Sequence, residues 1–195
     1  MFNKMKKRKY KQKARAEQVQ ETRQLIIDAT VKLHEQLGPA KTTIKAIAEQ
    51  AGVQRLTVYR HFPDETSLFQ ACSSHWLGLH PLPVVSESKD DDSVKQTTKT
   101  LLSFYLYYRQ TEGMWRSIYH DVDDVAALRE PMRKIESYID AIRDELLAAW
   151  KVKAKDKKQL SLTLRHCLRF STWCSLKNEK LPDKQLVELV MSWLV

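Results

Sequence analysis

Apolar residues recur at helical spacing along most of the chain, and few segments show the alternating pattern of a β-strand. A first helix is predicted to run from about Glu21 to the Gly38-Pro39 pair, with an apolar row at i, i+3, i+7 and i+11 formed by Ile26, Ala29, Leu33 and Leu37. The 195 residues include only 4 Gly and 6 Pro, which are fewer turn residues than a chain of many strands requires. We therefore expect an all-α protein.

Two short helices joined by a tight turn are predicted next. The first begins after Thr43, a good N-cap, and carries apolar residues at i, i+3, i+4 and i+7: Ile44, Ile47, Ala48 and Ala51. Gly52 can adopt the positive φ that ends this helix and reverses the chain. The second helix starts near Gln54 and packs Val58 and Phe62 back on the first. Because its outer face is polar, cationic and aromatic, the pattern predicts a helix-turn-helix.

This outer face has two interpretations. It suits a helix that enters the DNA major groove, where each base pair displays a distinct pattern of donors, acceptors and methyl groups. The alternative is a pair of core helices with a solvated charged face. Charge favours DNA, because residues 1–62 hold 14 Lys and Arg against 5 Asp and Glu, whereas residues 63–195 hold 19 of each. All of the net charge of +9 thus lies in the N-terminal third, where it can neutralise phosphates.

Residues 42–69, TTIKAIAEQAGVQRLTVYRHFPDETSLF, resemble the DNA-binding segment of the tetracycline-repressor (TetR) family of bacterial transcriptional regulators. The specific part is T-x-x-x-I-A-x-x-A-G-V followed by T, a hydrophobic residue and Y-x-H-F-P. The resemblance implies that four residues face base edges: Lys45, Arg55, Leu56 and Arg60. It implies that four others mainly hold phosphates: Thr43, Thr57, Tyr59 and His61. The chemistry agrees, because Arg can bind guanine in a bidentate manner and hydroxyl and imidazole groups suit phosphate oxygens.

Two positions depart from the family pattern. Many members have a small residue where Leu56 stands, which changes the bases that can be read. Many also have a phosphate-binding Lys at the position of Glu65, so one backbone contact is lost here. Neither departure changes the assignment of the segment, but together they leave the operator sequence open.

We expect three parts along the chain: a basic arm over residues 1–20, a helix-turn-helix DNA-binding domain over residues 21–66, and a larger helical ligand-binding and dimerisation domain over residues 67–195. Residues 1–18 carry eight Lys or Arg and one Glu with almost no apolar content, so the arm is expected to be mobile or a frayed helix. It either contacts DNA, along phosphates or in the minor groove, or is a solvated tail.

The third part is predicted to contain several further helices. One joins the head to the body and ends at the prolines at 81 and 83, and residues 80–92 form a linker. Ser93 to Gln96 read as a capping box, and Gly113 is expected to break the helix that follows. Later helices are predicted at about Val125–Trp150, Asp156–Leu176 and Pro182–Leu194.

Aromatic residues in this part have two explanations. Any one of them is most simply core, whereas several around a cavity would orient an apolar or cationic ligand. The resemblance implies a cavity, and the candidate ligand residues are Phe104, Tyr108, Trp115, Tyr119, Tyr138 and Trp173.

The apolar excess of the last two predicted helices suggests a dimer. In the family, two such helices from each of two chains form a four-helix bundle. The candidate interface residues are Leu164, Leu168, Leu186, Leu189, Val190 and Trp193. The alternative is that these residues are buried inside one chain.

Catalytic, cofactor and metal chemistry is not expected. The sequence shows no nucleophile with a positioned base and no phosphate loop, and His120, Asp121, Asp123 and Asp124 lack clear ligand spacing and read as a polar loop. Cys72, Cys167 and Cys174 read as buried inert thiols, although Cys167 and Cys174 would share one helix face. No apolar run could span a bilayer and the start lacks the core of a signal peptide, so a soluble, cytoplasmic protein is expected.

These patterns together predict a DNA-binding transcriptional regulator. The interpretation is a homodimeric, ligand-responsive repressor that binds a palindromic double-stranded DNA operator and an unidentified small-molecule effector, with no membrane partner and no enzymatic activity. The alternative is a nucleic-acid-binding structural or partner-recruiting protein that has no small-molecule ligand.

Overall fold

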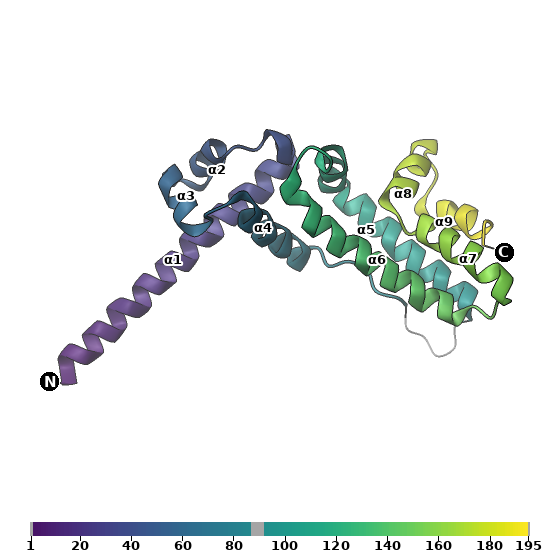
Figure 1. Ribbon diagram of the computed structural model, residues 1–195, viewed down its shortest axis with the longest axis horizontal. Helices are drawn as coiled ribbons and strands as arrows, with labels where there is room; N and C mark the ends of the chain where they lie inside the picture. Colours follow the sequence, from purple (N-terminus) through teal and green to yellow (C-terminus); the bar gives the residue numbers. More distant parts are fainter. Residues whose placement is uncertain (1, 87–91, 195) are drawn as a thin grey trace. The chain divides into compact units, whose positions relative to one another are not determined.

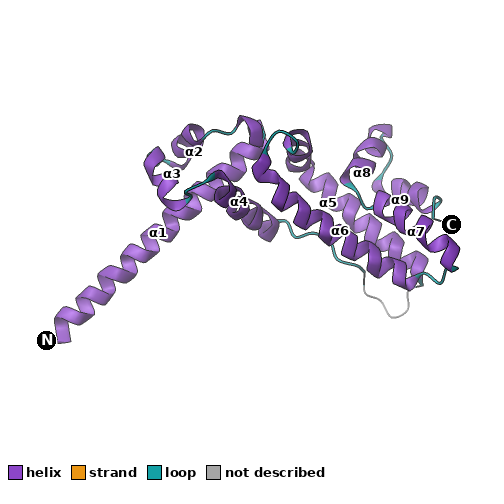
Figure 2. Cartoon of the chain, in the orientation of Figure 1, coloured by secondary structure: helices purple, strands orange, loops and turns teal. Residues whose placement is uncertain are grey.

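The computed structural model describes residues 2–86 and 92–194, and every regular element within them is a helix (Figures 1 and 2). This confirms the all-α prediction. The α-helices are α1 (Phe2–Leu37), α2 (Ile44–Ala51), α3 (Arg55–His61), α4 (Glu65–Leu79), α5 (Ser93–Asp121), α6 (Arg129–Ala149), α7 (Ala154–Cys167), α8 (Phe170–Leu176) and α9 (Asp183–Met191). Short 3₁₀ helices are η1 (Pro39–Lys41), η2 (Ala126–Leu128) and η3 (Lys177–Glu179). Within the described ranges, no helix is long and apolar enough to cross a membrane.

The chain divides into two compact units. The N-terminal unit comprises the residues up to Leu79 together with Ser117–Leu128, and the C-terminal unit comprises His80–Arg116 together with the residues from Arg129 onward. The last residues of α5 and the whole of η2 therefore belong to the N-terminal unit, although they follow much of the C-terminal unit in sequence. The boundaries predicted at residues 20 and 66 stay a prediction.

The N-terminal unit has a small core in which α1, α2, α3 and α4 meet. Ile26, Ile47, Val58 and Leu68, one from each of these helices, are at most 2% exposed. They belong to one cluster, which Phe62 closes at the end of α3. The predicted helical rows thus pack as the 3.6-residue period requires.

Helix α1 is longer than the sequence predicts. It begins at Phe2 and not near Glu21, so the basic arm is a continuous extension of the first helix. All side chains described from position 12 to position 21 are exposed, and the first buried one is Ile26. Within the N-terminal unit, Figure 1 shows this extension projecting beyond α2, α3 and α4.

Helix α5 differs from its prediction at two points. Its first turn is capped by Asp92, whose carboxylate accepts from the Lys95 amide at 2.8 Å, and not by a box beginning at Ser93. The expected break at Gly113 is a kink at Thr111, where φ is −115° and ψ is 15°, and the helix then resumes. The Thr111 hydroxyl donates to the Tyr107 carbonyl at 2.6 Å, which takes up an acceptor near the kink.

The predicted helix from Asp156 to Leu176 is two helices. Helix α7 ends at Cys167, and Arg169 is extended, with φ −78° and ψ 143°, before α8 begins. Cys167 and Cys174 consequently lie on different helices and do not share a face. Three successive carbonyls at the break accept hydrogen bonds from side-chain hydroxyls: Thr172 to His166 at 2.6 Å, Tyr105 to Cys167 at 3.2 Å and Tyr108 to Leu168 at 2.7 Å.

An ion pair joins α5 to the start of α9 in the C-terminal unit. Arg109 donates to both carboxylate oxygens of Asp183, at 2.6 and 2.7 Å, and Trp173 Nε1 donates to the same carboxylate at 3.1 Å. Burial by itself raises the pKa of Asp183, but the hydrogen bonds from Arg109 and Trp173 outweigh it and leave this pKa below its ordinary value. A buried carboxylate is therefore kept ionised by two donors.

Candidate nucleic-acid interface

The helix-turn-helix is fixed by two local devices. Thr43 Oγ1 accepts from the Ala46 amide at 3.1 Å and caps α2. At the other end Gly52 has φ 67° and ψ 30°, and Val53 donates to the Ala48 carbonyl at 2.9 Å. Because Ile47, Ala48 and Val58 are buried, the turn holds α3 in one rotation about its axis, and its other face points outward.

The outward face of α3 contains the residues that the sequence singles out. Leu56 is 58% exposed and Tyr59 51% exposed, and both are large for such exposed positions. Arg55 and Arg60 are exposed too, while Thr57 and His61 are half-buried. No carboxylate within the described ranges forms an ion pair with Arg55 or Arg60, so these two guanidinium groups can meet an anionic partner without breaking an internal bridge.

The two predicted contacts on and before α2 are both exposed. Lys45 lies 3.8 Å from the Glu49 carboxylate one turn later, an exposed pair of small energetic weight. The Thr43 hydroxyl uses an acceptor lone pair for capping, so its hydrogen stays available to a phosphate oxygen. Both residues lie in the same unit as α3, so the unit brings the eight predicted contacts into one substructure.

The start of α4 does not offer an anion site. Asp64 caps the helix by accepting from the Ser67 amide at 2.7 Å, and Glu65 is an exposed acid in the first turn. A phosphate would meet two carboxylates there, which agrees with the departure noted at Glu65.

The sequence missed a role for Asp121, which it assigned to a polar loop. Asp121 is 5% exposed, and its Oδ2 accepts from the Ala40 amide at 2.8 Å. Its Oδ1 lies 2.6 Å from His120 Nδ1. Burial raises the pKa of Asp121, but hydrogen bonds from His120 and Ala40 outweigh it, so the carboxyl stays ionised. The end of α5 thereby holds η1, the corner that leads into α2. The sequence does not indicate this contact, because 81 residues separate Ala40 from Asp121.

His34 on α1 is a second buried polar residue of this unit. It is 4% exposed, its ring centroid lies 4.7 Å from that of Phe69, and its Nδ1 lies 3.7 Å from Cys72 Sγ. Burial lowers the pKa of His34 to about 4, against an opposing effect of Asp121. Burial likewise raises the pKa of Cys72 to about 12, which keeps this thiol protonated at neutral pH. Cys72 and Cys167 are buried as predicted, whereas Cys174 is half-buried.

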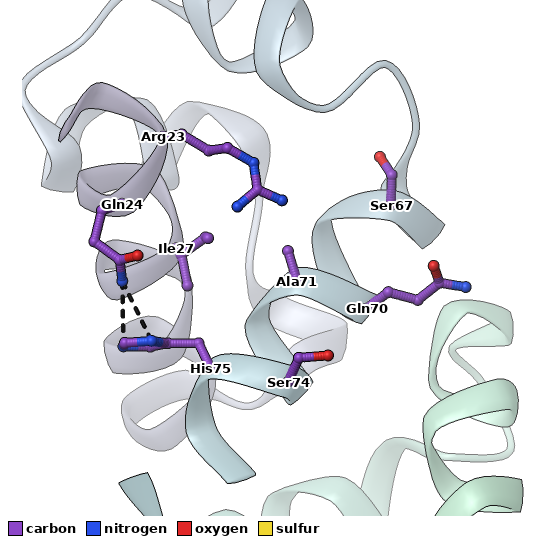
Figure 3. Close-up of a pocket in the computed structure, with 8 residues that line it drawn as sticks. All are labelled: Arg23, Gln24, Ile27, Ser67, Gln70, Ala71, Ser74 and His75. Atoms are coloured by element: carbon purple, nitrogen blue, oxygen red, sulfur yellow. Dashed lines mark hydrogen bonds between the residues drawn. The ribbon is translucent and has the colours of Figure 1, made fainter. Parts of the chain in front are cut away.

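A shallow groove of about 500 Å³ lies between α1 and α4 in this unit (Figure 3). Its lining is mostly polar and consists of Arg23, Gln24, Ile27, Ser67, Gln70, Ala71, Ser74 and His75. Gln24 bridges to the His75 ring at 3.3 Å. The Arg23 guanidinium carbon lies 4.8 Å from the ring centroid of Phe62, the residue that ends α3. The groove thus adjoins the end of the candidate recognition helix.

The predicted ligand residues do not all come together. Four of them, Phe104, Tyr108, Trp115 and Trp173, are buried in the C-terminal unit. The ring of Tyr108 lies 5.4–6.1 Å from the rings of the other three and of Phe170, which was not predicted. Tyr119 is half-buried and belongs to the N-terminal unit. Tyr138 donates to the Pro83 carbonyl at 3.1 Å. Pro83 borders a groove of about 510 Å³ that is also lined by Val84, Val85, Ser86, Lys99 and Ser103. The ligand role of these residues stays a prediction.

The predicted dimer residues divide into two groups. Leu164, Leu168, Leu186 and Val190 are all 0% exposed and fill the core of the C-terminal unit, as the alternative of burial within one chain expects. Leu189 and Trp193 are each 41% exposed. The sequence missed Leu162, which is 60% exposed on α7. Leu162 is one turn before His166, whose ring lies 6.2 Å from that of Trp193. The exposed apolar residues Leu162, Leu189 and Trp193 therefore form one surface, called here the α7–α9 surface.

Known proteins resemble the chain in two ways. Residues 26–72 match the model of the bacterial regulatory proteins of the tetR family. The HTH-type transcriptional regulator TtgR of Pseudomonas putida is 38% identical over 91 residues, which are 46% of this chain and 43% of TtgR. The match thus spans less than half of the length of that relative.

Solved structures share the fold over most of the chain. A TetR-like transcriptional regulator from Rhodococcus sp. RHA1 has a TM-score of 0.61 and 16% identity, over 89% of this chain and 93% of its own. The multidrug binding protein EbrR, solved with imidazole, has a TM-score of 0.56 and 18% identity, over 89% of each chain. At such identities the likeness shows the fold alone.

The helix-turn-helix geometry and the matched family model agree that residues 26–72 are similar to the DNA-binding segment of the tetR family of bacterial regulatory proteins, and solved TetR-like regulators share the fold of most of the chain.

Proposed function

We propose that the chain is a ligand-responsive repressor that acts as a homodimer on a palindromic operator. The observation that carries the proposal is the outward face of α3, where Arg55, Leu56, Tyr59 and Arg60 are exposed on a helix whose opposite face is locked into the core. A major groove admits one such helix. A repressor that acts on bacterial DNA works in the cytoplasm, so the proposal includes a cytoplasmic location for this protein.

Base reading and phosphate binding fall to different residues in this proposal. Arg55 and Arg60 can each make a bidentate contact to guanine, Leu56 can meet a thymine methyl group, and Lys45 reaches the groove edge from α2. Thr43, Thr57, Tyr59 and His61 hold phosphates and fix the register of the helix on the duplex. The large, exposed side chain of Leu56 would disfavour a base that presents no apolar group in the major groove.

The α7–α9 surface supports the proposed homodimerisation. Leu162, Leu189 and Trp193 expose apolar area that water disfavours, and a second copy of the chain can cover it through a two-fold axis. A dimer presents two copies of α3, which matches the two half-sites of a palindrome.

An effector would act by binding one conformation of the dimer more tightly than another. The groove beside Pro83, next to the Tyr138 hydroxyl, is our candidate site for it. EbrR, which has the same fold, is a multidrug binding protein, so cationic dyes and small heterocycles are suitable first probes. A probe that raises the melting temperature and loosens operator binding would support an effector role.

The alternative is a DNA-binding protein without a small-molecule ligand. The packing of Tyr108, Trp115 and Trp173 against one another favours it for those residues, because their rings form a core. Should a broad screen of metabolites and dyes give neither thermal shift nor release of DNA, this alternative would hold.

Selection of bound sequences from random DNA tests the proposal directly. A palindromic consensus is expected from the wild-type chain. Arg55→Ala should weaken the free energy of operator binding by about 1–3 kcal/mol and relax the base preference at one position per half-site. Tyr59→Ala should weaken binding without changing the consensus. Arg133→Ala, an exposed Arg on α6, is the control for loss of one positive charge. Equal loss on all DNA sequences for both α3 variants would contradict the base-reading role of Arg55.

A further inference from the structure

The described side chains of the N-terminal extension of α1 make no contact with the core of their own unit. Every described side chain from position 12 to position 21 is exposed, and packing begins at Thr22 and Arg23. Residues 2–21 form a helix of about 30 Å at 1.5 Å per residue, which is close to one turn of duplex DNA. We call residues 2–21 the arm.

The arm is strongly cationic. Eight Lys or Arg and a single Glu occur in residues 1–18, and the described Lys13–Glu17 pair is exposed on both sides at 3.8 Å. Like charges at neighbouring helical positions destabilise an isolated helix, so a polyanion that neutralised them would stabilise the arm. Its apolar residues, such as Phe2 and Tyr10, are too few to form the apolar face that a membrane-surface helix needs.

The cationic positions follow the helical period. Positions 4, 7, 8, 11 and 15 fall at i, i+3, i+4, i+7 and i+11, on one face of α1. The same row continues through Thr22, Ile26 and Ala29 into the core. Positions 6, 9 and 13 fall on the opposite face. By the helical period, the larger group is therefore in register with the row of α1 that contacts the helix-turn-helix farther along the helix.

The arm leaves the core beside the recognition helix. Arg23, the first partly buried cation of α1, lies over the ring of Phe62, which ends α3 (Figure 3 shows Arg23 at the α1 edge of the groove). A duplex held by α3 therefore has its flanking backbone near the root of the arm.

We propose that the arm is a second DNA-binding element, which lies along the phosphate backbone flanking the site read by α3, with positions 4, 7, 8, 11 and 15 toward the duplex. The inference rests on the proposed function, because it takes α3 to be in the major groove. The arm adds affinity and salt dependence, and it adds no base reading, since Lys and Arg on a helix outside the groove meet only phosphates.

Two triple variants of the full chain test the proposal. Lys7→Gln, Lys11→Gln and Arg15→Gln remove three charges from the proposed face. Lys6→Gln, Lys9→Gln and Lys13→Gln remove three charges from the opposite face as the matched control. Gln keeps the helix propensity of Lys and Arg, and circular dichroism checks helix content. Binding is measured from 50 to 200 mM salt on a long duplex with flanks and on a short duplex trimmed to the selected consensus.

The proposed face should account for most of the salt effect. On the long duplex, the Lys7, Lys11 and Arg15 variant should reduce the slope of log K against log salt by up to about 2.7 per arm, since each phosphate contact contributes about 0.9. The control should change the slope by less than half as much. On the short duplex the two variants should bind alike.

Several outcomes would overturn the proposal. Equal slope changes for the two variants would show only diffuse attraction, and no change for either would show that the arm does not touch DNA. Binding of the wild type to phosphatidylserine vesicles, lost in the variant with an unchanged DNA slope, would assign the arm to a membrane surface. Failure of the proposed function is separate, because the wild type would then select no consensus at all.

Discussion

The phenol of Tyr108 on α5 donates a 2.7 Å hydrogen bond to the carbonyl oxygen of Leu168, the residue that follows α7. Tyr108 and Leu168 are both 0% exposed, so water cannot replace this bond. With the bonds from Tyr105 and Thr172 to the two preceding carbonyls, it satisfies the acceptors that the break between α7 and α8 removes from helical pairing. Two tyrosines of α5 thereby stabilise the end of α7, which lies about 60 residues later in the sequence.

Tyr108→Phe should lower the free energy of unfolding by about 1–3 kcal/mol, because the Leu168 carbonyl is left buried without its donor. The ring packing is kept, so the loss reports the hydroxyl alone. Denaturant unfolding followed by circular dichroism measures it. Tyr59→Phe removes a hydroxyl from a ring that is 51% exposed and should change the stability by less than about 0.5 kcal/mol. Equal stabilities for the two variants would contradict the structural role of Tyr108.

The helix-turn-helix could be predicted from sequence because its signals are local. The cap at Thr43, the αL residue Gly52 and the apolar row through Ile47 and Val58 all act within a few residues. The break after Cys167 could not be predicted, because the tyrosines that support it are about 60 residues away.

The sequence also could not show which apolar residues of a helix are buried. Leu164 and Leu189 are both apolar residues on helices with an apolar excess, yet one is 0% and the other 41% exposed. The period of each helix gives its apolar face, but only the packing of α7 and α9 on their neighbours decides which residues of that face remain outside. The contacts of Asp121 and His34 could not be predicted for the same reason, since their partners come from other helices.

Gly38→Ala should destabilise the N-terminal unit. Gly38 has φ 84°, which strains an L residue, and an added Cβ would lie 2.8 Å from Asp121 Oδ2. That oxygen already accepts from the Ala40 amide at 2.8 Å, so the carboxylate cannot retreat without losing a bond. We expect a loss of about 1–3 kcal/mol in thermal or denaturant unfolding.

Gly78→Ala is the matched control for this change. Gly78 lies near the end of α4 with nothing within 4 Å of an added Cβ. Its substitution should leave stability unchanged or raise it by up to about 1 kcal/mol. A Gly38→Ala variant as stable as Gly78→Ala would show that Asp121 does not restrain the corner.

Protonation of His34 should destabilise the N-terminal unit in mild acid. Its pKa is about 4 in the folded chain against 6.5 for an ordinary His, so between these values the unfolded chain binds a proton that the folded chain does not. Stability should therefore fall as pH drops from 6.5 to 4, by on the order of 3 kcal/mol in total. Nε2 of His34 has no hydrogen-bond partner within the described residues, which agrees with a neutral ring.

His34→Met should remove the part of the pH dependence of stability that is due to His34. Unfolding measured at steps between pH 4 and pH 7 should give a difference between wild type and variant that changes over this interval. Ile27→Val, a core change in the same unit, should shift the whole curve by about 0.5–1.5 kcal/mol without changing its pH dependence. A wild-type curve parallel to that of His34→Met would mean that His34 is charged in the folded chain or does not titrate there.

Leu189→Glu should separate the proposed homodimer into monomers. Leu189 is 41% exposed on α9, one turn before Trp193, so Glu is tolerated in a free chain but places an unpaired charge inside a covered α7–α9 surface. The dimer dissociation constant should rise at least about 100-fold in sedimentation measurements. Leu106→Glu, at a residue 44% exposed on α5, is the control and should leave the dimer intact. Operator affinity should fall with dimerisation, because two linked copies of α3 bind a palindrome more tightly than one. A Leu189→Glu variant that still sediments as a dimer would place the interface on another surface.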